Sequence, residues 1–218
     1  TIRFNTGAID HELTFGIDHE REQGDANVAS DRTQPFANRF RTTGYFVQDR
    51  ARFGQAYLSA GARADRFNAR YRNVGYSATE ASLNLSGGVF VTDQLEFFAG
   101  YGEAARAAGT LPVHFARNVT DDAQVPDSPE RSRNLEAGLR WTGEEGAILG
   151  GQAFGTLTLF RNRIENFILY DQPGTGGRGG RPVTALFNQD DTIQAEGGSA
   201  RAGWQRDAWR LELSYLRN

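Results

Sequence analysis

The 218-residue sequence contains no cysteine, no lysine and no long hydrophobic run, and its formal net charge is only -3. Without cysteine, the chain has no disulfides, thiolate metal sites or cysteine nucleophiles. A net charge this close to zero gives no electrostatic basis for binding nucleic acid. No run approaches the roughly 20 apolar residues that a membrane-spanning helix needs. These absences exclude a helical membrane protein but not a membrane β-barrel, whose strands carry apolar residues only at alternate positions.

The sequence does contain a repeated two-residue alternation of apolar and polar side chains. In AYLSAGARADRF (56–67), Leu58 and Ala60 share one side, and Ser59, Arg63 and Asp65 share the other. The same pattern recurs in residues 11–20, 82–91, 95–103, 132–141 and 208–215, and less regularly in 42–53, 148–170 and 183–204. No twelve residues keep a helical apolar stripe between a cap and a stop. The pattern predicts an all-β chain of about nine strands, with a bulge in at least one of the irregular ranges.

The expected connections alternate between two lengths. Short ones fall near residues 53–55, 92–94, 142–146 and 205–207, and long polar ones near 22–40, 72–80, 107–130 and 172–182. Up-and-down hairpins of this kind, with short turns at one end and long loops at the other, are typical of outer-membrane barrels. Aromatic residues near strand ends and full charges in mid-strand also favour lipid on one side and a wet lumen on the other. A soluble antiparallel sheet with one solvated face is the alternative.

Five motifs follow one another in a fixed order: YFVQDR (45–50), LSAGARAD (58–65), FAGYGEAARAAGTLP (98–112), DSPERSRNLEAGLRW (127–141) and TLTLFRNRIENFI (156–168). Together they resemble the barrel of TonB-dependent outer-membrane receptors. The family's F-x-Q-D, G-x-R-x-D, Y-x-E-x-x-R-A and P-E-x-S-x-N-x-E-x-G patterns are all present. The chain departs from the family at Ala108, where the third motif has no proline, and at QVPDS (124–128), which replaces an N-P-x-L pattern.

The resemblance implies an antiparallel up-and-down transmembrane barrel in the outer membrane of a Gram-negative bacterium. Family members close about 22 strands around a plug, so residues 1–218 are expected to be a partial barrel domain without the plug and the C-terminal strands. Such receptors take up scarce nutrients, most often ferric siderophores or haem, with energy supplied through TonB acting on the plug. The implied partners are outer-membrane lipid, the TonB complex and an iron chelate, and no cofactor is implied beyond the transported ligand.

Two alternatives remain open from the residues alone. One is a small passive outer-membrane barrel of eight to ten strands, and the other is a soluble β-protein that binds partners. An enzyme is not expected, because the sequence contains neither a G-x-S-x-G motif nor a histidine near a nucleophile motif. The glycine-rich run 174–181 lacks the Lys-Ser/Thr and the helix of a phosphate-binding loop.

Candidate binding residues fall into two groups. The expected extracellular loops and strand ends contain cationic or imidazole side chains that could attract or ligate an anionic chelate or haem: Arg106, His114, Arg117, Arg178 and Arg181. The resemblance places His114 in the interval where haem receptors of the family carry a haem-liganding histidine. Residues expected to face the lumen and the plug are Arg63, Asp65, Asn134, Glu136 and Arg140.

The tetrapeptide IDHE occurs at 9–12 and again at 17–20, and its histidine and carboxylates suggest a metal site at first sight. On a strand, however, Asp18 and Glu20 point to one face and His19 to the other. Three convergent ligands are therefore not available, and no metal site is expected there.

Overall fold

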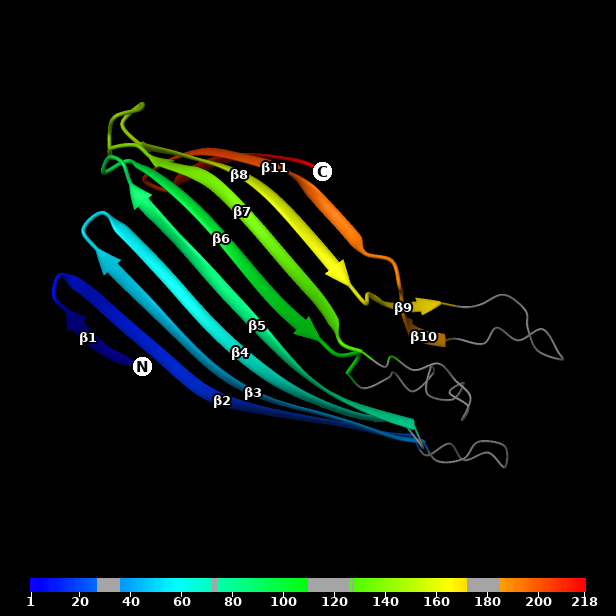
Figure 1. The fold of residues 1–218 in the computed structure, drawn as a ribbon. Helices are drawn as coiled ribbons and strands as arrows, with labels where there is room; N and C mark the ends of the chain where they lie inside the picture. Colours follow the sequence, from blue (N-terminus) through cyan, green and yellow to red (C-terminus); the bar gives the residue numbers. More distant parts are fainter. Residues whose placement is uncertain (27–35, 72–73, 110–125, 127, 172–184) are drawn as a thin grey trace.

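The chain forms one curved antiparallel sheet of ten strands with a separate two-stranded hairpin (Figure 1). The computed structural model describes residues 1–26, 36–71, 74–109, 126, 128–171 and 185–218. The strands are β1 (Ile2–Thr6), β2 (Ile9–Ala26), β3 (Phe36–Phe53), β4 (Ala56–Tyr71), β5 (Val74–Phe90), β6 (Leu95–Arg106), β7 (Glu130–Thr142), β8 (Gln152–Glu165), β9 (Ile168–Asp171), β10 (Ala185–Asn188), β11 (Ile193–Arg206) and β12 (Trp209–Arg217). Among these residues, no helix is long and apolar enough to cross a membrane.

Neighbours in the sheet are neighbours along the chain, except that β8 pairs with β11 and the β9–β10 hairpin stands apart. Short connections join β1 to β2, β3 to β4, β5 to β6, β7 to β8 and β11 to β12 at one end of the sheet, which we call the turn end. In the β1–β2 and β3–β4 turns, as also between β7 and β8, glycines adopt a positive φ that L-residues rarely adopt; it is 65° at Gly7 and 59° at Gly54. The opposite end is called the loop end.

The register divides the side chains between two faces. One, here called the apolar face, carries Phe15 opposite Val47, Leu85 opposite Tyr101, and the alanines of β4. The other, the polar face, carries most of the charged and hydroxyl side chains of mid-strand. Large apolar side chains on the apolar face are exposed, as in Ile17 at 69% and Leu159 at 64%. An isolated water-soluble sheet would bury such a face, so the arrangement fits a wall between lipid and a polar interior.

Several expected connections are shorter than the sequence suggested. Residues 74–80 were expected in a loop, but they belong to β5, which pairs with β4 as far as Tyr71 and Val74. Residues 22–26 and 36–40, also expected in a loop, extend β2 and β3 and pair as far as Ala26 and Phe36. The expectation of long loops at 72–80 and 22–40 was therefore wrong in extent, because toward the loop end the apolar residues of the strands change face: Phe40 and Phe67 are buried on the polar face.

The strand count and the expected bulge also need correction. The structure adds β1, which the sequence analysis did not predict, to the nine expected strands of the main sheet. The ranges 148–170 and 183–204 are each interrupted; in the first, β8 gives way to β9 at Asn166, whose φ is 54°. The described ladders of β3, β8 and β11 keep one register throughout, so the irregular alternation there does not arise from a bulge.

Candidate functional site: the polar face of the sheet

The first charged cluster of the polar face is centred on Arg63 of β4. Its guanidinium donates to both carboxylate oxygens of Asp65 at 2.7 and 2.6 Å and to both of Asp18 on β2 at 2.7 and 2.9 Å. The side chain crosses β3 at Gly44, where an added Cβ would lie 2.7 Å from Asp65 Oδ1. Asp65 is buried, with a relative exposure of 5%. One network of charge-assisted, bidentate hydrogen bonds thus joins β4 to β2 across the intervening strand β3.

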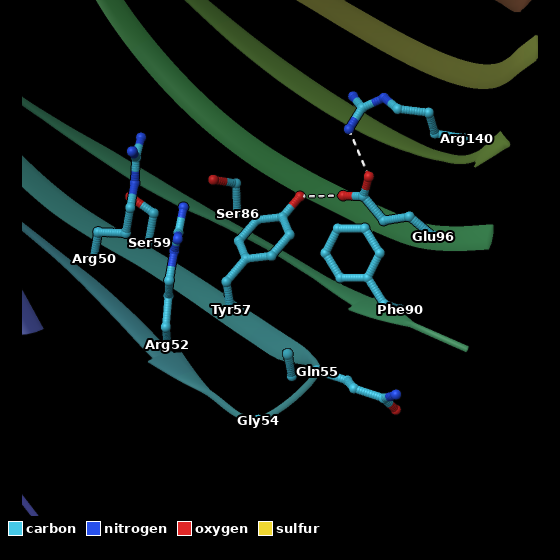
Figure 2. A pocket seen from close by; sticks show the side chains of 11 residues that line it. Arg50, Arg52, Gly54, Gln55, Tyr57, Ser59, Ser86, Phe90, Glu96 and Arg140 are labelled. Carbon is cyan, nitrogen blue, oxygen red and sulfur yellow. Dashed lines mark hydrogen bonds and ion pairs between the residues drawn. The ribbon is translucent and has the colours of Figure 1, made fainter. Parts of the chain in front are cut away.

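A second cluster lies nearer the turn end, around Glu96 of β6 (Figure 2). The hydroxyl of Tyr57 donates to Glu96 Oε1 at 2.5 Å, and Arg140 of β7 donates to Glu96 Oε2 at 2.6 Å. The ring of Tyr57 lies over Gly88 of β5, where an added Cβ would lie 2.8 Å from two ring carbons and from the hydroxyl oxygen of Tyr57. Glu96 is only 4% exposed, so its two donors compensate for the loss of water.

This cluster borders a hollow of about 420 Å³ whose lining also includes Arg50 and Arg52 of β3. Both arginines are exposed. Because Glu96 is already satisfied by Tyr57 and Arg140, the hollow presents positive charge from two further guanidinium groups. Its chemistry suits a carboxylate or another anionic group approaching from the polar side.

The loop end of the polar face holds a third ion pair, Arg106 to Glu130, at 2.9 Å. Glu130 also accepts the backbone N–H of Ile168 at 3.3 Å and is 9% exposed. Asn188 of β10 donates to the carbonyl oxygens of Ser128 and Asn166 at 2.9 and 2.8 Å. These contacts tie the start of β7 to the β9–β10 hairpin. The ion pair also connects the third and fourth sequence motifs, since Arg106 belongs to one and Glu130 to the other.

The structure places the sequence-predicted residues as follows. Arg63, Asp65, Asn134, Glu136 and Arg140 all lie on the polar face, as their strand positions require. They do not form one cluster, since Arg63 with Asp65 and Arg140 belong to separate networks. Arg106 is the last residue of β6 and not a loop residue, and its guanidinium is engaged by Glu130. His114, Arg117, Arg178 and Arg181 lie outside the described residues.

Sequence reasoning missed the acids and the phenol that complete these networks, namely Asp18, Tyr57, Glu96 and Glu130. Tyr57 and Glu96 lie 39 positions apart, and only the register of the three strands β4, β5 and β6 brings them together. Alternation does place Asp18 on the polar side, but no sequence signal indicates its partner. In the described part of the chain no three metal-ligating side chains converge, and the repeated IDHE is split as expected: Asp18 bonds Arg63, whereas His19 bonds Thr43 on the opposite face.

Comparison with known proteins places this wall in a family. The model of the TonB-dependent receptor-like β-barrel matches residues 1–218. Heme/hemopexin utilization protein C of Haemophilus influenzae is 25% identical over 223 residues, an alignment that covers 98% of this chain and 25% of that protein. The chain therefore spans a quarter of the length of this curated relative.

Solved structures share the fold. A double mutant of the Serratia marcescens hemophore receptor HasR, in complex with its hemophore HasA and heme, superposes with a TM-score of 0.75 at 15% identity and covers 98% of this chain and 39% of that one. The alcaligin outer-membrane receptor FauA from Bordetella pertussis gives 0.63 at 16% identity, covering 98% of this chain and 36% of that one. The expectation of an all-β, antiparallel partial barrel is confirmed. The matched family is one of receptors, in agreement with the expectation of a non-enzymatic protein.

Proposed function

Because this chain belongs to the TonB-dependent receptor β-barrel family, we propose that it forms part of the wall of an outer-membrane receptor that takes up an iron-bearing nutrient. The family match over residues 1–218 is the observation that carries the proposal. In the proposed receptor, the apolar face contacts the lipid of a Gram-negative outer membrane, and the polar face surrounds a plug through which the TonB complex acts. The full-length receptor binds its ligand from the loop end.

The charge distribution of the polar face supports a plugged interior. Arg63 and Glu96 each bind two partners from other positions on the wall, so neither needs a plug residue to satisfy it. Arg50 and Arg52 instead remain exposed beside the hollow at the turn end. We assign them as contacts for acidic side chains of the plug, since an arginine fork matches a carboxylate in two hydrogen bonds.

A ferric siderophore complex is the first candidate ligand, as expected from the resemblance; FauA is described as an alcaligin outer-membrane receptor. Haem is the second candidate. Two observations favour it: the curated relative is described as a heme/hemopexin utilization protein, and HasR was solved with heme. In both cases the ligand-binding roles of Arg106, His114, Arg117, Arg178 and Arg181 are predictions.

Growth on single iron sources tests the proposal. The gene for the full-length receptor is deleted in the source bacterium, and the strain is grown under iron restriction with either hemin or one ferric siderophore of a panel. We expect growth to be lost on one source and kept on the others, to return with a plasmid copy, and to be lost equally on deletion of TonB. Loss on hemin alone identifies haem as the ligand. Undiminished growth on every source would overturn the proposal.

A further inference from the structure

The arginines of the apolar face gather at one level of the sheet. Of the 24 basic residues, all arginine, 19 lie in the described part of the chain. Eight of these are on the polar face, and Arg206 is at the turn end of the apolar face. The other ten lie on the apolar face at the loop end: Arg21, Arg39, Arg41, Arg66, Arg70, Arg131, Arg133, Arg161, Arg163 and Arg217. We call these ten residues the arginine collar. Between them and Arg206, the described apolar face contains no arginine.

The collar follows the upper edge of the apolar layer. One row of paired residues crosses seven strands: Leu13, Asp49, Ala60, Leu85, Tyr101, Leu135 and Arg161. On each strand, the distance from this row to the nearest collar arginine is counted in residues toward the loop end. It is eight residues on β2 (Arg21) and β3 (Arg41), six on β4 (Arg66), two on β7 (Arg133) and zero on β8, where Arg161 itself belongs to the row. A steady decrease of this kind is what a tilted strand requires if the arginines stand at one height above the lipid.

Two sectors of the collar differ in their partners. On β7 and β8 the arginines are paired with carboxylates: Arg133 with Glu165 at 3.3 Å, Arg163 with Glu165 at 3.1 Å and Arg161 with Glu196 at 3.6 Å. Here the positive charge is largely neutralised within the wall.

On β2, β3 and β4, by contrast, no ion pair is found for Arg21, Arg39, Arg41 or Arg66 among the described side chains, and all four are exposed. Arg21 stands directly opposite Arg41. Like charges directly opposite on adjacent strands are destabilising unless an anion lies between them. This sector therefore has the chemistry of an anion site.

An apolar hollow lies directly below these four arginines, toward the turn end. It measures about 770 Å³ and is lined on the apolar face by Phe15, Ile17, Tyr45, Val47, Ala62, Ala64, Ala81 and Leu83. Alanines at 62, 64 and 81 form its floor, while the larger side chains of β2, β3 and β5 form its sides. A cationic cluster above an apolar depression matches an amphiphile with an anionic head and hydrocarbon chains.

We propose that the β2–β4 sector is a specific binding site for a lipid with a phosphate-bearing headgroup. The phosphate bridges the facing arginines Arg21 and Arg41 with help from Arg39 and Arg66, since guanidinium forks bind phosphate oxygens in pairs. The acyl chains lie in the alanine-floored hollow. The site faces the surrounding leaflet at the loop end and not the polar interior, so it is separate from nutrient uptake, and its occupant is a membrane lipid and not free phosphate.

Binding of a phosphorylated glycolipid to the purified full-length receptor tests this inference. The probe is diphosphorylated lipid A in detergent micelles, compared with the same lipid after enzymatic dephosphorylation, with bound lipid counted by native mass spectrometry. We expect the variant Arg21→Gln/Arg39→Gln/Arg41→Gln/Arg66→Gln to bind lipid A at least tenfold more weakly than wild type. Dephosphorylated lipid should bind wild type and variant alike. Inorganic phosphate at millimolar concentration should not displace lipid A.

The matched control is Arg161→Gln/Arg163→Gln, which removes two charges at the same height from the paired sector and should change binding less than threefold. A second variant, Ala62→Trp/Ala64→Trp, fills the hollow and leaves the arginines in place; it should also weaken lipid A binding. Heat-modifiable gel migration establishes that each variant is folded. Equal binding by wild type and the fourfold variant, equal loss in the control, or displacement by inorganic phosphate would overturn the proposal.

Discussion

Glycines on the polar face determine where individual large side chains lie. The Arg63 side chain crosses its neighbouring strand at Gly44, and the Tyr57 ring lies against Gly88. At both positions a Cβ would come within 3 Å of side-chain atoms, closer than ordinary van der Waals contact. Each glycine therefore lets a long side chain lie flat along the wall and reach a partner on another strand. This keeps the interior of the barrel open for whatever occupies it.

Replacement of Gly88 by alanine should destabilise the receptor. The new methyl group would meet the Tyr57 ring and force it away from Glu96, breaking the 2.5 Å hydrogen bond to a buried carboxylate. Overpacking of this kind costs about 1–3 kcal/mol. The unfolding temperature of the full-length receptor in detergent, measured by heat-modifiable gel migration, should fall.

Gly102→Ala is the matched control, because a Cβ there meets nothing within 4 Å; its unfolding temperature should stay the same or rise slightly. In a Tyr57→Ala background the additional effect of Gly88→Ala should vanish. A Gly88→Ala penalty that persists without the Tyr57 ring would show that the ring contact is not its cause.

At the scale of strands, alternation predicted the two faces correctly but not the strand lengths. Residues 74–80 were assigned to a long polar loop, yet they continue β5. Above the apolar layer the alternation changes face: Phe40 and Phe67 lie on the polar face there and are buried, whereas Arg66 on the opposite face is exposed. Partners such as Tyr57 and Glu96 were unpredictable for a different reason: they depend on a register summed over several hairpins, whereas alternation fixes only the face of each strand.

The junction of β5 and β6 is the weakest in the main sheet between β2 and β8. Its ladder covers only Asn84–Phe90 against Glu96–Gly102, although β5 continues to Val74. Where the ladder stops, the carboxylate of Glu103 accepts the backbone N–H of Leu83 at 3.2 Å. A side chain thus takes the place of the next backbone acceptor, and the two strands separate toward the loop end.

Removal of this side chain should open the junction further. In the variant Glu103→Ala the Leu83 amide loses its acceptor, so its hydrogen exchange in the full-length receptor should accelerate at least tenfold. The Leu85 amide, which points to the same neighbouring strand inside the ladder, should be unaffected. Glu103→Gln retains an acceptor oxygen and should exchange within about threefold of wild type. Equal acceleration at Leu83 and Leu85 would mean that the whole ladder depends on Glu103, contrary to this explanation.

At the scale of the whole molecule, the sheet has two open edges, β1 and β12. Unpaired strand edges are not tolerated within a lipid layer, since their N–H and C=O groups have no water to bind. The wall formed by residues 1–218 therefore needs further strands to close. The curated and solved relatives, of which it covers 25% to 39%, have enough additional chain to supply them.

The arginine collar also predicts how the strands tilt in the membrane. The number of residues that separate the nearest collar arginine from one row of paired residues decreases from eight on β2 to zero on β8. At about 3.3 Å per residue and about 4.8 Å between strands, this is a drop of ~26 Å across ~29 Å of sheet, a tilt of about 40°. That value lies within the ~35–45° of transmembrane barrels.

Polarised infrared spectroscopy of the full-length receptor in oriented bilayers measures this tilt through the dichroism of the amide I band. We expect a mean strand tilt of about 40° from the membrane normal, in the range of other transmembrane barrels. The same orientation places Arg21, Arg41, Arg66, Arg133 and Arg161 at one depth, so spin labels at cysteines substituted singly for Arg41 and Arg161 should show equal accessibility to a lipid-soluble quencher. A tilt below about 20°, outside the range of known barrels, or clearly different depths for the two labels, would mean that the arginines do not mark the membrane surface. In that case their alignment along the sheet would have no relation to lipid.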